Sequence, residues 1–203
     1  MQRDARETDD ASGPHPLPDI HVRAAEPADG PALTRIDHDT WSTRVTPTPP
    51  LPPARPFFDP DTPPANVLVA YEGSEVRGFV KIRPSRMAAS GHVQYIHGFA
   101  VDPAHQGRGI GVLLLTAARA EAVRRSARRI TLHVLGTNSR AWRLYEKCGY
   151  TVEGIAKGEF LLDGRYVDSV SMALELEPAA ALDPVGNTAE EGDAGTPPSA
   201  DRP

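Results

Sequence analysis

The chain has 203 residues, of which 39% are hydrophobic, and it carries a formal net charge of −5 at pH 7. This length can bury one sizeable core and the hydrophobic content excludes a wholly disordered protein, so we expect a single folded domain. No apolar run approaches the roughly 20 residues of a membrane-spanning helix. The single cysteine, Cys148, excludes an internal disulfide. Together with an acidic N-terminus unlike a secretory signal, these features predict a cytoplasmic protein.

The two ends of the chain differ from its middle in charge. Residues 1–19 hold five acidic residues and two arginines, and residues 177–203 hold six acidic residues and one arginine. The segment between them therefore keeps 16 acidic and 19 basic residues, a net charge of +3. Both ends are rich in Pro, Gly and Ala and lack periodic apolar residues. We expect disordered acidic tails at 1–18 and 178–203 around one domain at 19–177.

The apolar spacing predicts alternating strands and helices within this domain. The expected elements, in chain order, are a strand at 20–24, a helix from Pro27, a hairpin at 67–82, a strand at 92–101, a helix from Gly111, a strand at 129–135, a helix at 137–149 and a hairpin at 159–176. The hairpins are indicated by Glu72-Gly73-Ser74 and by Asp163-Gly164. This order predicts a mixed α/β fold around one central sheet.

A proline-rich insert interrupts the pattern at residues 45–65. Nine of the 21 prolines fall between Pro47 and Pro64. Proline fixes the backbone and removes a hydrogen-bond donor, so this segment must be an irregular connector. It is either a stiff surface loop or a lip over a substrate site that carries Phe57 and Phe58.

Residues 101–115, VDPAHQGRGIGVLLL, place three glycines at alternate positions directly before an apolar helix. The free amides and positive dipole of a helix start attract anions, and glycine lets phosphate oxygens approach the backbone closely. The spacing fits neither the G-x-G-x-x-G dinucleotide fingerprint nor the P-loop. A packing turn is the alternative, and we favour phosphate binding because Gln106 and Arg108 flank the glycines.

The segment Gln106-Gly-Arg-Gly109-Ile-Gly111 resembles the Q/R-x-x-G-x-G/A signature of the GNAT N-acetyltransferase superfamily. The later segment LHVLGTNSRAWRLYEKCGY is similar to the family's strand–Asn–helix–Tyr–Gly–aromatic region. The resemblance covers residues 20–176 and is closest in detail to ribosomal-protein N-terminal acetylases and small amino-acid acetylases. It implies the GNAT fold, a mixed central sheet splayed at the acetyl-CoA site with helices on both faces. The proline-rich insert departs from this pattern, which leaves the acceptor open.

The resemblance implies acetyl-CoA as the acetyl donor. Its pyrophosphate would lie on the amides of residues 107–112, and its pantetheine arm would pair with the strand backbone at 99–101. Asn138 would either bond the pantetheine amide or cap the last helix. The residues expected to bind the cofactor are Phe99, Ala100, Val101, Gln106, Gly107, Arg108, Gly109, Ile110, Gly111, Val112, Asn138 and Arg140.

Acetyl transfer to an amine needs a base for the ammonium and an acid for the departing thiolate. Tyr145 stands at the family's position for the acid, and its alternative is a core tyrosine. His133, His97 and Tyr95 compete as the base, with His133 first, and water alone is a further alternative. No His or Cys pair at ligand spacing has a matching second pair, so no metal site is predicted.

These features predict an N-acetyltransferase that moves acetyl from acetyl-CoA to a primary amine by direct attack. The acceptor is a protein N-terminus, an amino acid or a small amine. A non-catalytic acyl-CoA-binding regulatory module is the alternative. The basic run at Arg119, Arg124, Arg125, Arg128 and Arg129 is interpreted as a solvated helix face, and contact with the CoA 3′-phosphate or with RNA is the alternative. We therefore favour a protein without a nucleic-acid partner, and we expect no membrane partner. The sequence leaves the oligomeric state open, a homodimer included.

Overall fold

The computed structural model describes residues 19–50, 52 and 55–177, and its strands form one seven-stranded sheet. The elements are β1 (Ile20–Ala24), α1 (Gly30–Thr40), β2 (Val67–Glu72), β3 (Glu75–Pro84), β4 (Val93–Val101), α2 (Ile110–Arg124), β5 (Arg129–Leu135), α3 (Ser139–Lys147), β6 (Thr151–Leu162) and β7 (Arg165–Glu175). Short 3₁₀ turns lie at Pro27–Asp29, Pro64–Asn66, Ala88–Ser90 and Pro103–His105. The tails predicted at 1–18 and 178–203 lie outside the described residues.

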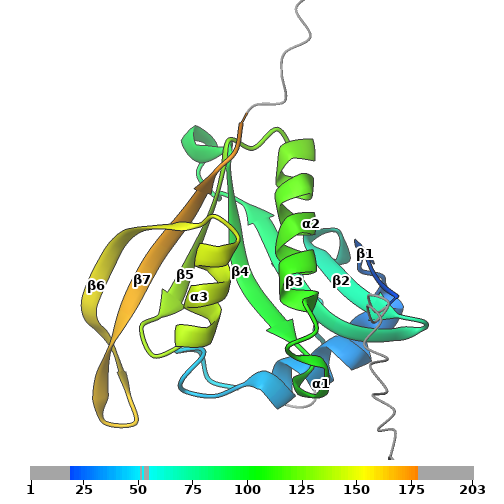
Figure 1. The fold of residues 1–203 in the computed structure, drawn as a ribbon, viewed down its shortest axis with the longest axis horizontal. Coiled ribbons are helices and arrows are strands. Elements are labelled where there is room, and N and C mark those ends of the chain that lie inside the picture. Colours follow the sequence, from blue (N-terminus) through cyan, green and yellow to red (C-terminus); the bar gives the residue numbers. More distant parts are fainter. Residues whose placement is uncertain (1–18, 51, 53–54, 178–203) are drawn as a thin grey trace, which may run out of the picture.

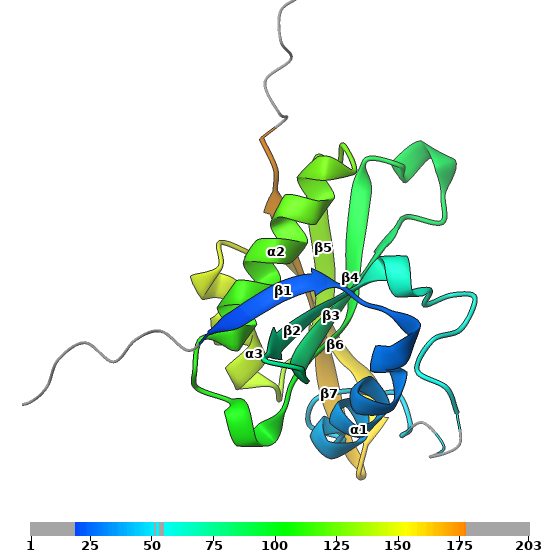
Figure 2. The same cartoon turned by 90° about the vertical axis from the view of Figure 1, so that its right-hand side faces the viewer.

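The helices cover both faces of the sheet, as the sequence predicted. The strand order is β1-β2-β3-β4-β5-β7-β6, with α2 and α3 on one face and α1 on the other (Figures 1 and 2). On the α2 side, Leu114, Ala118 and Ala122 pack in the larger core cluster with the sheet. On the α1 side, Leu33 and Ile36 pack in a second cluster. Within the described ranges, no helix combines the length and apolarity needed to cross a bilayer.

The sheet divides near its centre, between β4 and β5. β4 and β5 run parallel, and they pair only from Val93 with Arg129 to Ile96 with Leu132. Beyond this point β4 continues beside β3 as far as Val101, while β5 continues beside β7. The two halves of the sheet separate into a fork, which opens toward the bottom of Figure 1. This fork is the splayed sheet that the sequence predicted.

The last hairpin is longer than predicted. β6 begins at Thr151, eight residues before the expected start at Glu159. It is an edge strand whose register shifts twice, so its apolar residues do not alternate and the periodicity is lost. The turn itself is as predicted, because Asp163 and Gly164 both adopt positive φ angles, 49° and 74°.

The two phenylalanines of the proline-rich insert belong to the core. Phe57 is buried, and its ring centroid lies 4.9 Å from that of Phe79 on β3 and 5.3 Å from that of Phe58. The proposed lip carrying these aromatic residues is therefore wrong. They anchor the insert against the α1 face of the sheet.

The segment that leads into the insert runs instead toward the open end of the fork. The Trp41 indole donates to the Thr48 carbonyl oxygen at 2.8 Å. The Thr43 hydroxyl donates to Asp163 in the β6–β7 turn at 2.5 Å, and the Thr137 hydroxyl donates to the Arg44 carbonyl oxygen at 3.1 Å. These contacts bridge α1, the start of α3 and the last hairpin.

Candidate active site

A cleft of about 1350 Å³ lies where β4 and β5 separate. Its walls come from both strands of the fork, from the start of α2, from α3, from the segment after α1 and from the last hairpin. Among the site residues predicted from the sequence, the following line it: His97, Phe99, Ala100, Val101, Gln106, Gly107, Gly109, Ile110, Gly111, Val112, His133, Asn138, Arg140 and Tyr145. Arg108 does not.

The glycine-rich loop presents free backbone amides at one end of the cleft. Gly107 and Gly109 adopt left-handed φ angles of 85° and 82°, which side-chain-bearing residues rarely adopt. Among the described residues, none of the amides from 107 to 111 donates to a protein acceptor, whereas the Val112 amide already donates to the Gly109 carbonyl oxygen at 3.0 Å. Five amides at the start of α2 therefore form a cradle for an anion.

Gly111 serves a different purpose from the two glycines before it. A Cβ atom at this position would lie 2.8 Å from the Leu144 Cδ2 atom and 3.3 Å from the Phe99 Cζ atom. Around Gly107 and Gly109, by contrast, an added Cβ would meet nothing within 4 Å. Gly111 thus contributes its amide to the cradle, while its missing side chain allows α2 to approach α3 closely.

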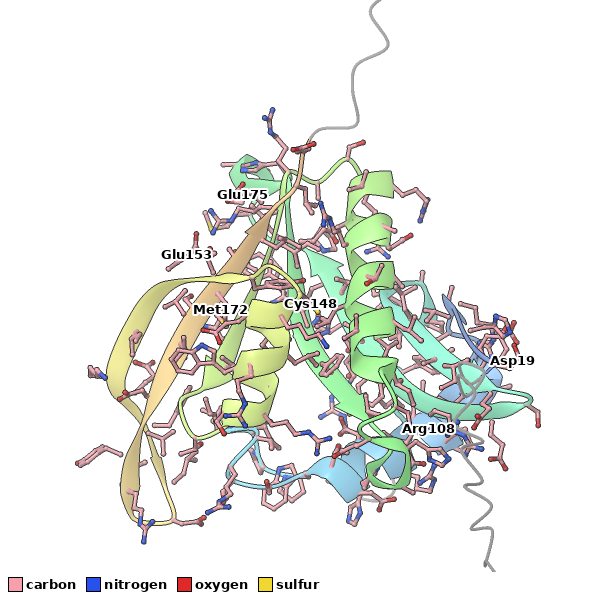
Figure 3. The ribbon with its side chains drawn as sticks, viewed as in Figure 1. Asp19, Arg108, Cys148, Glu153, Met172 and Glu175 are labelled. Carbon is pink, nitrogen blue, oxygen red and sulfur yellow. The ribbon has the colours of Figure 1, made fainter. Side chains whose placement is uncertain are left out.

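The two arginines predicted near the phosphates differ in placement. Arg140 on α3 donates to the Gln106 side-chain oxygen, and Gln106 donates in turn to the Val101 carbonyl oxygen at 3.0 Å. Arg108 points away and pairs with Glu72 at 2.6 Å, on the far side of the loop from α3 (Figure 3). The predicted role of the Arg108 side chain is therefore corrected, because its charge is already satisfied. Only its backbone amide faces the cradle.

Asn138 forms the cap of α3. Its side-chain oxygen accepts a hydrogen bond from the Ala141 amide at 3.2 Å, which satisfies one of the free donors of the first turn. Of the two roles predicted for Asn138, the structure thus contains the cap. Its contact with pantetheine stays a prediction.

Tyr145 is buried yet belongs to the wall of the cleft. Its ring lies between Phe99 and Tyr150, with centroid distances of 6.1 and 5.8 Å. In the described part of the chain its hydroxyl has no hydrogen-bond partner. Burial raises the pKa of Tyr145 above its ordinary value, so the phenol stays protonated at neutral pH. Tyr145 thus combines a packed ring with a protonated hydroxyl that has no hydrogen-bond partner among the described residues.

The two candidate histidines flank the point where the fork opens. Ile96 and Leu132 are the last paired residues of β4 and β5, and His97 and His133 follow them directly on the two strands. Both side chains are exposed and line the cleft, as does Tyr95 two residues earlier on β4. His97 is the extra residue of a β-bulge, since Ile96 pairs with Ile82 and Gly98 with Lys81.

His97 is neutral at physiological pH. Loss of surrounding water, followed by the positive charges of Arg83 and Lys81, lowers the pKa of His97 to about 4. The His97 side chain is exposed to the cleft, and the surrounding atoms of the cleft wall exclude part of the water around its imidazole. It is available to accept a proton, but as a weak base.

No activated thiol or metal cluster accompanies these groups. Cys148 is half-buried between α3 and α2, away from the cleft, and burial raises the pKa of its thiol (Figure 3). Within the described residues, no group of three or more His, Cys, Asp or Glu side chains is arranged to hold a metal ion.

The basic run of the sequence is largely neutralised. Arg124 and Arg125 both pair with Glu121 on α2, each at 2.7 Å. Arg129 pairs with Glu153 and Glu175 of the last hairpin. Arg124 is exposed, as the interpretation of a solvated face predicted, whereas Arg125 and Arg129 are half-buried. None of the three lines the cleft.

Several charged residues that line the cleft were not predicted from the sequence. Lys81 and Arg83 on β3 line it, together with Asp37 and Glu159 from α1 and β6. The only signal was the alternation of β3, which places positions 81 and 83 on one face without indicating which face. Residues 45–49 also contribute to the wall, ahead of the phenylalanines that the sequence had suggested.

Two relatives share part of the chain. A spermidine N(1)-acetyltransferase of Vibrio cholerae serotype O1 is 37% identical over 82 residues, which cover 37% of this chain and 47% of the relative. An L-methionine sulfoximine/L-methionine sulfone acetyltransferase of Salmonella typhimurium is 31% identical over 117 residues, which cover 58% of this chain and 68% of the relative. The chain thus spans about half the length of the first relative and about two thirds of the second.

A solved structure shares the fold. The structure of yncA from Salmonella typhimurium with its cofactor acetyl-CoA matches with a TM-score of 0.67 at 24% identity, covering 82% of this chain and 99% of that one. The sequence profile described as the Acetyltransferase (GNAT) family matches residues 31–150, more than half of the chain. This range contains the cradle, the fork and Tyr145. The chain therefore belongs to the GNAT family, a family of acyltransferases that take their acetyl group from acetyl-CoA.

Proposed function

We propose that this protein transfers the acetyl group of acetyl-CoA to a primary amine by direct attack of the amine on the thioester. The fork carries this proposal, because it leaves the β4 backbone at 97–101 without a partner strand on its β5 side. The same cleft holds the amide cradle at 107–111. A long, phosphorylated and strand-like ligand fits such a site.

The cradle and the free strand edge would hold two parts of the donor. The amides of residues 107–111 would bind the pyrophosphate, with the dipole of α2 adding to the attraction. The β4 backbone at 99–101 would pair with the pantetheine arm as a missing strand would. The thioester would then lie toward the branch point of the fork, between His97 and His133.

The side chains at the branch point supply the proton transfers. An incoming alkyl amine is largely protonated at neutral pH and must lose a proton before it attacks. We assign this step to His133, because the pKa of about 4 makes His97 a poorly matched base. Tyr145 would donate the proton that the departing thiolate needs. Cys148 lies outside the cleft, so no acetylated cysteine is required.

The relatives are consistent with an amine acceptor. By their names, one acts on spermidine and the other on methionine sulfoximine and methionine sulfone. The alternative, a module that binds acyl-CoA without catalysis, leaves the position of Tyr145 unexplained. Sensing a ligand does not require a phenol hydroxyl that faces the cleft without a protein partner.

Removal of a single hydroxyl group tests this proposal. Thiol release from acetyl-CoA is measured over a panel of amines for the parent, Tyr145→Phe and Tyr150→Phe. Tyr145→Phe keeps the packed ring, so we expect acetyl-CoA affinity within a few-fold of the parent and kcat lower by about 10²- to 10⁴-fold.

Tyr150→Phe is the matched control. Its hydroxyl is buried without a partner and its ring contacts Tyr145, but it does not line the cleft. We expect kcat close to that of the parent. A Tyr145→Phe enzyme as fast as the parent would remove this residue from the chemistry. Tight acetyl-CoA binding without thiol release for any amine would favour the non-catalytic module.

A further inference from the structure

Two positively charged side chains face the acceptor end of the cleft. Lys81 and Arg83 lie two residues apart on β3, so they leave the strand on the same side. Ile82 between them is fully buried on the other side, in the core beneath α2. Both cations line the cleft, and both are half-buried.

These two cations differ from the other half-buried basic side chains of the described chain. Each of the others pairs with a carboxylate, in the pairs Arg23–Asp29, Arg77–Glu72, Arg125–Glu121 and Arg129–Glu175. Lys81 and Arg83 have no carboxylate within 4 Å among the described residues. A half-buried charge without a counter-ion is unfavourable, and an anion entering the cleft would relieve it.

Aromatic rings hold the two cations in place. The Lys81 ammonium lies 4.1 Å from the centroid of Phe57 and 5.4 Å from that of Phe79, and burial lowers the pKa of Lys81. The Arg83 guanidinium lies 5.4 Å from the centroid of Tyr95. Cation–π contacts position a charge but do not neutralise it.

Gly98 on the facing strand makes room for Lys81. A Cβ atom at this position would lie 2.6 Å from the Lys81 Cδ atom and 3.1 Å from its Cγ atom. The backbone of Gly98 is not in the left-handed region, so its conformation does not require glycine. The missing side chain leaves room for the Lys81 stem beside Gly98, with its ammonium over the Phe57 ring.

We propose that the acceptor is a primary amine that also carries a carboxylate, which Lys81 and Arg83 bind while the amine reaches the branch point of the fork. This inference rests on the proposed acetyl transfer and names its substrate class. It favours amino acids and related acidic amines over polyamines.

The acidic residues of the cleft do not reverse this preference. Asp39 and Glu159 are exposed, and Asp39 pairs with Arg35 at 3.3 Å. Asp37 is half-buried, and its charge acts on Lys81 from a distance beyond ion pairing. Exposed carboxylates keep their water shell and need no counter-ion. Half-buried cations have lost part of their water shell, so they gain more from a bound anion. A zwitterion would satisfy both kinds of group.

Matched acceptors provide the test. L-Methionine, L-glutamate and L-phenylalanine are each compared with the corresponding α-carboxamide, and spermidine is included as the polyamine. We expect the free acids to have the higher kcat/KM. Lys81→Met and Arg83→Gln should lower kcat/KM for the preferred acid by about 10- to 100-fold, the loss expected for a hydrogen bond to a charged group. The values for its amide should barely change.

Two further variants distinguish the effect of the position of Lys81 from the effect of the overall charge. Gly98→Ala keeps every charge but displaces Lys81, so it should weaken use of the acid in the same direction. Arg165→Gln removes one positive charge at an exposed position outside the cleft lining, and should leave both acceptors unchanged. The melting shift with acetyl-CoA checks that each variant is folded.

A binding measurement keeps this inference distinct from acetyl transfer itself. N-Acetyl-L-methionine and N-acetyl-L-methioninamide are titrated calorimetrically into the CoA-bound protein. Preference for the acid without turnover of any amine would refute the proposed function and leave the anion site standing. Spermidine or the amides as better acceptors, or equal losses for acid and amide in Lys81→Met, would overturn the carboxylate assignment.

Discussion

The two ends of the cleft are built from different parts of the chain. The donor end consists of backbone amides from five consecutive residues, 107–111, at the start of one helix. The remaining wall, where we propose that the acceptor binds, consists of side chains from α1, β3, β4, β5, β6 and the segment after α1. A site made of backbone depends on local conformation, so a short motif can specify it. A site made of distant side chains exists only after the sheet has formed.

The largest effect should follow from forcing a side chain into the donor end. Gly109→Val places a β-branched residue at a φ of 82°, which costs about 1–3 kcal/mol and disturbs the amides. We expect acetyl-CoA to bind about 100-fold more weakly, the loss of one or two hydrogen bonds to a charged group. At a concentration 100 times the parent Kd, ligand stabilisation should then fall from about 2.7 to about 0.4 kcal/mol.

Gly73→Val is the matched control for this change. Gly73 also has a left-handed φ, 60°, and open space around it, but it lies in the β2–β3 turn. We expect a similar loss of stability with unchanged acetyl-CoA affinity. Equal melting shifts in Gly109→Val and the parent would refute the amide cradle.

The fold and the place of the glycine-rich loop in the cleft wall were largely predictable from the sequence. The glycine motif stands between an apolar strand and an apolar helix, and Asn138 precedes Tyr145 at the family spacing, so local pattern specified their places. The predictions were wrong where a residue distant in the sequence determines what a side chain contacts. Arg108 looked suited to a phosphate until the β2–β3 turn supplied Glu72. The missing side chain of Gly111 looked as if it made room for a phosphate, but the space beside it is filled by Leu144 of α3.

The acceptor end was not predictable for the same reason. Lys81 and Arg83 sit on an alternating strand, and alternation does not reveal which face will line a cleft. Their lack of counter-ions becomes visible only when every neighbouring carboxylate has a position. The edge strand β6 was underestimated because its bulges break the period of two on which strand prediction depends.

An effect of intermediate size should show whether the base is His133 on β5 or His97 on β4. If His133 is the base, His133→Ala should lower kcat/KM by about 100-fold and remove its decline toward acidic pH. His97→Ala should keep that decline, because the pKa of His97 lies at about 4 and this residue stays neutral above that pH. The measurement is the pH profile of kcat/KM from pH 5 to pH 9 with one accepted amine.

The outcome decides which strand of the fork handles the proton. Loss of the acidic decline in His97→Ala alone would move the base to β4 and contradict our assignment. Its persistence in both variants would leave Tyr95 or water as the acceptor of the proton, or would assign the decline to the ionisation of the substrate amine itself. Acetyl-CoA affinity serves as the control, since neither imidazole belongs to the amide cradle.

The smallest effect should come from Gly111, whose amide belongs to the donor end but whose missing side chain serves packing against α3. In Gly111→Ala the new methyl group would meet the Leu144 Cδ2 atom at 2.8 Å, so Leu144 or α3 must move. Overpacking of this kind costs about 1–3 kcal/mol, and the better helix propensity of alanine returns about 0.5–1 kcal/mol. We expect a net loss of about 1 kcal/mol in the free energy of unfolding, with acetyl-CoA affinity within a few-fold of the parent.

A double-mutant cycle with Leu144→Ala makes this last prediction specific. If the methyl group and Leu144 compete for the same space, the double variant should be more stable than the sum of the single losses allows, by at least about 0.5 kcal/mol. Independent effects would mean that Gly111 is not a packing residue. A loss of acetyl-CoA affinity as large as that of Gly109→Val would mean that the missing side chain of Gly111 also makes room for the ligand. The added Cβ points toward α3, away from the open side of the loop, so we expect neither result.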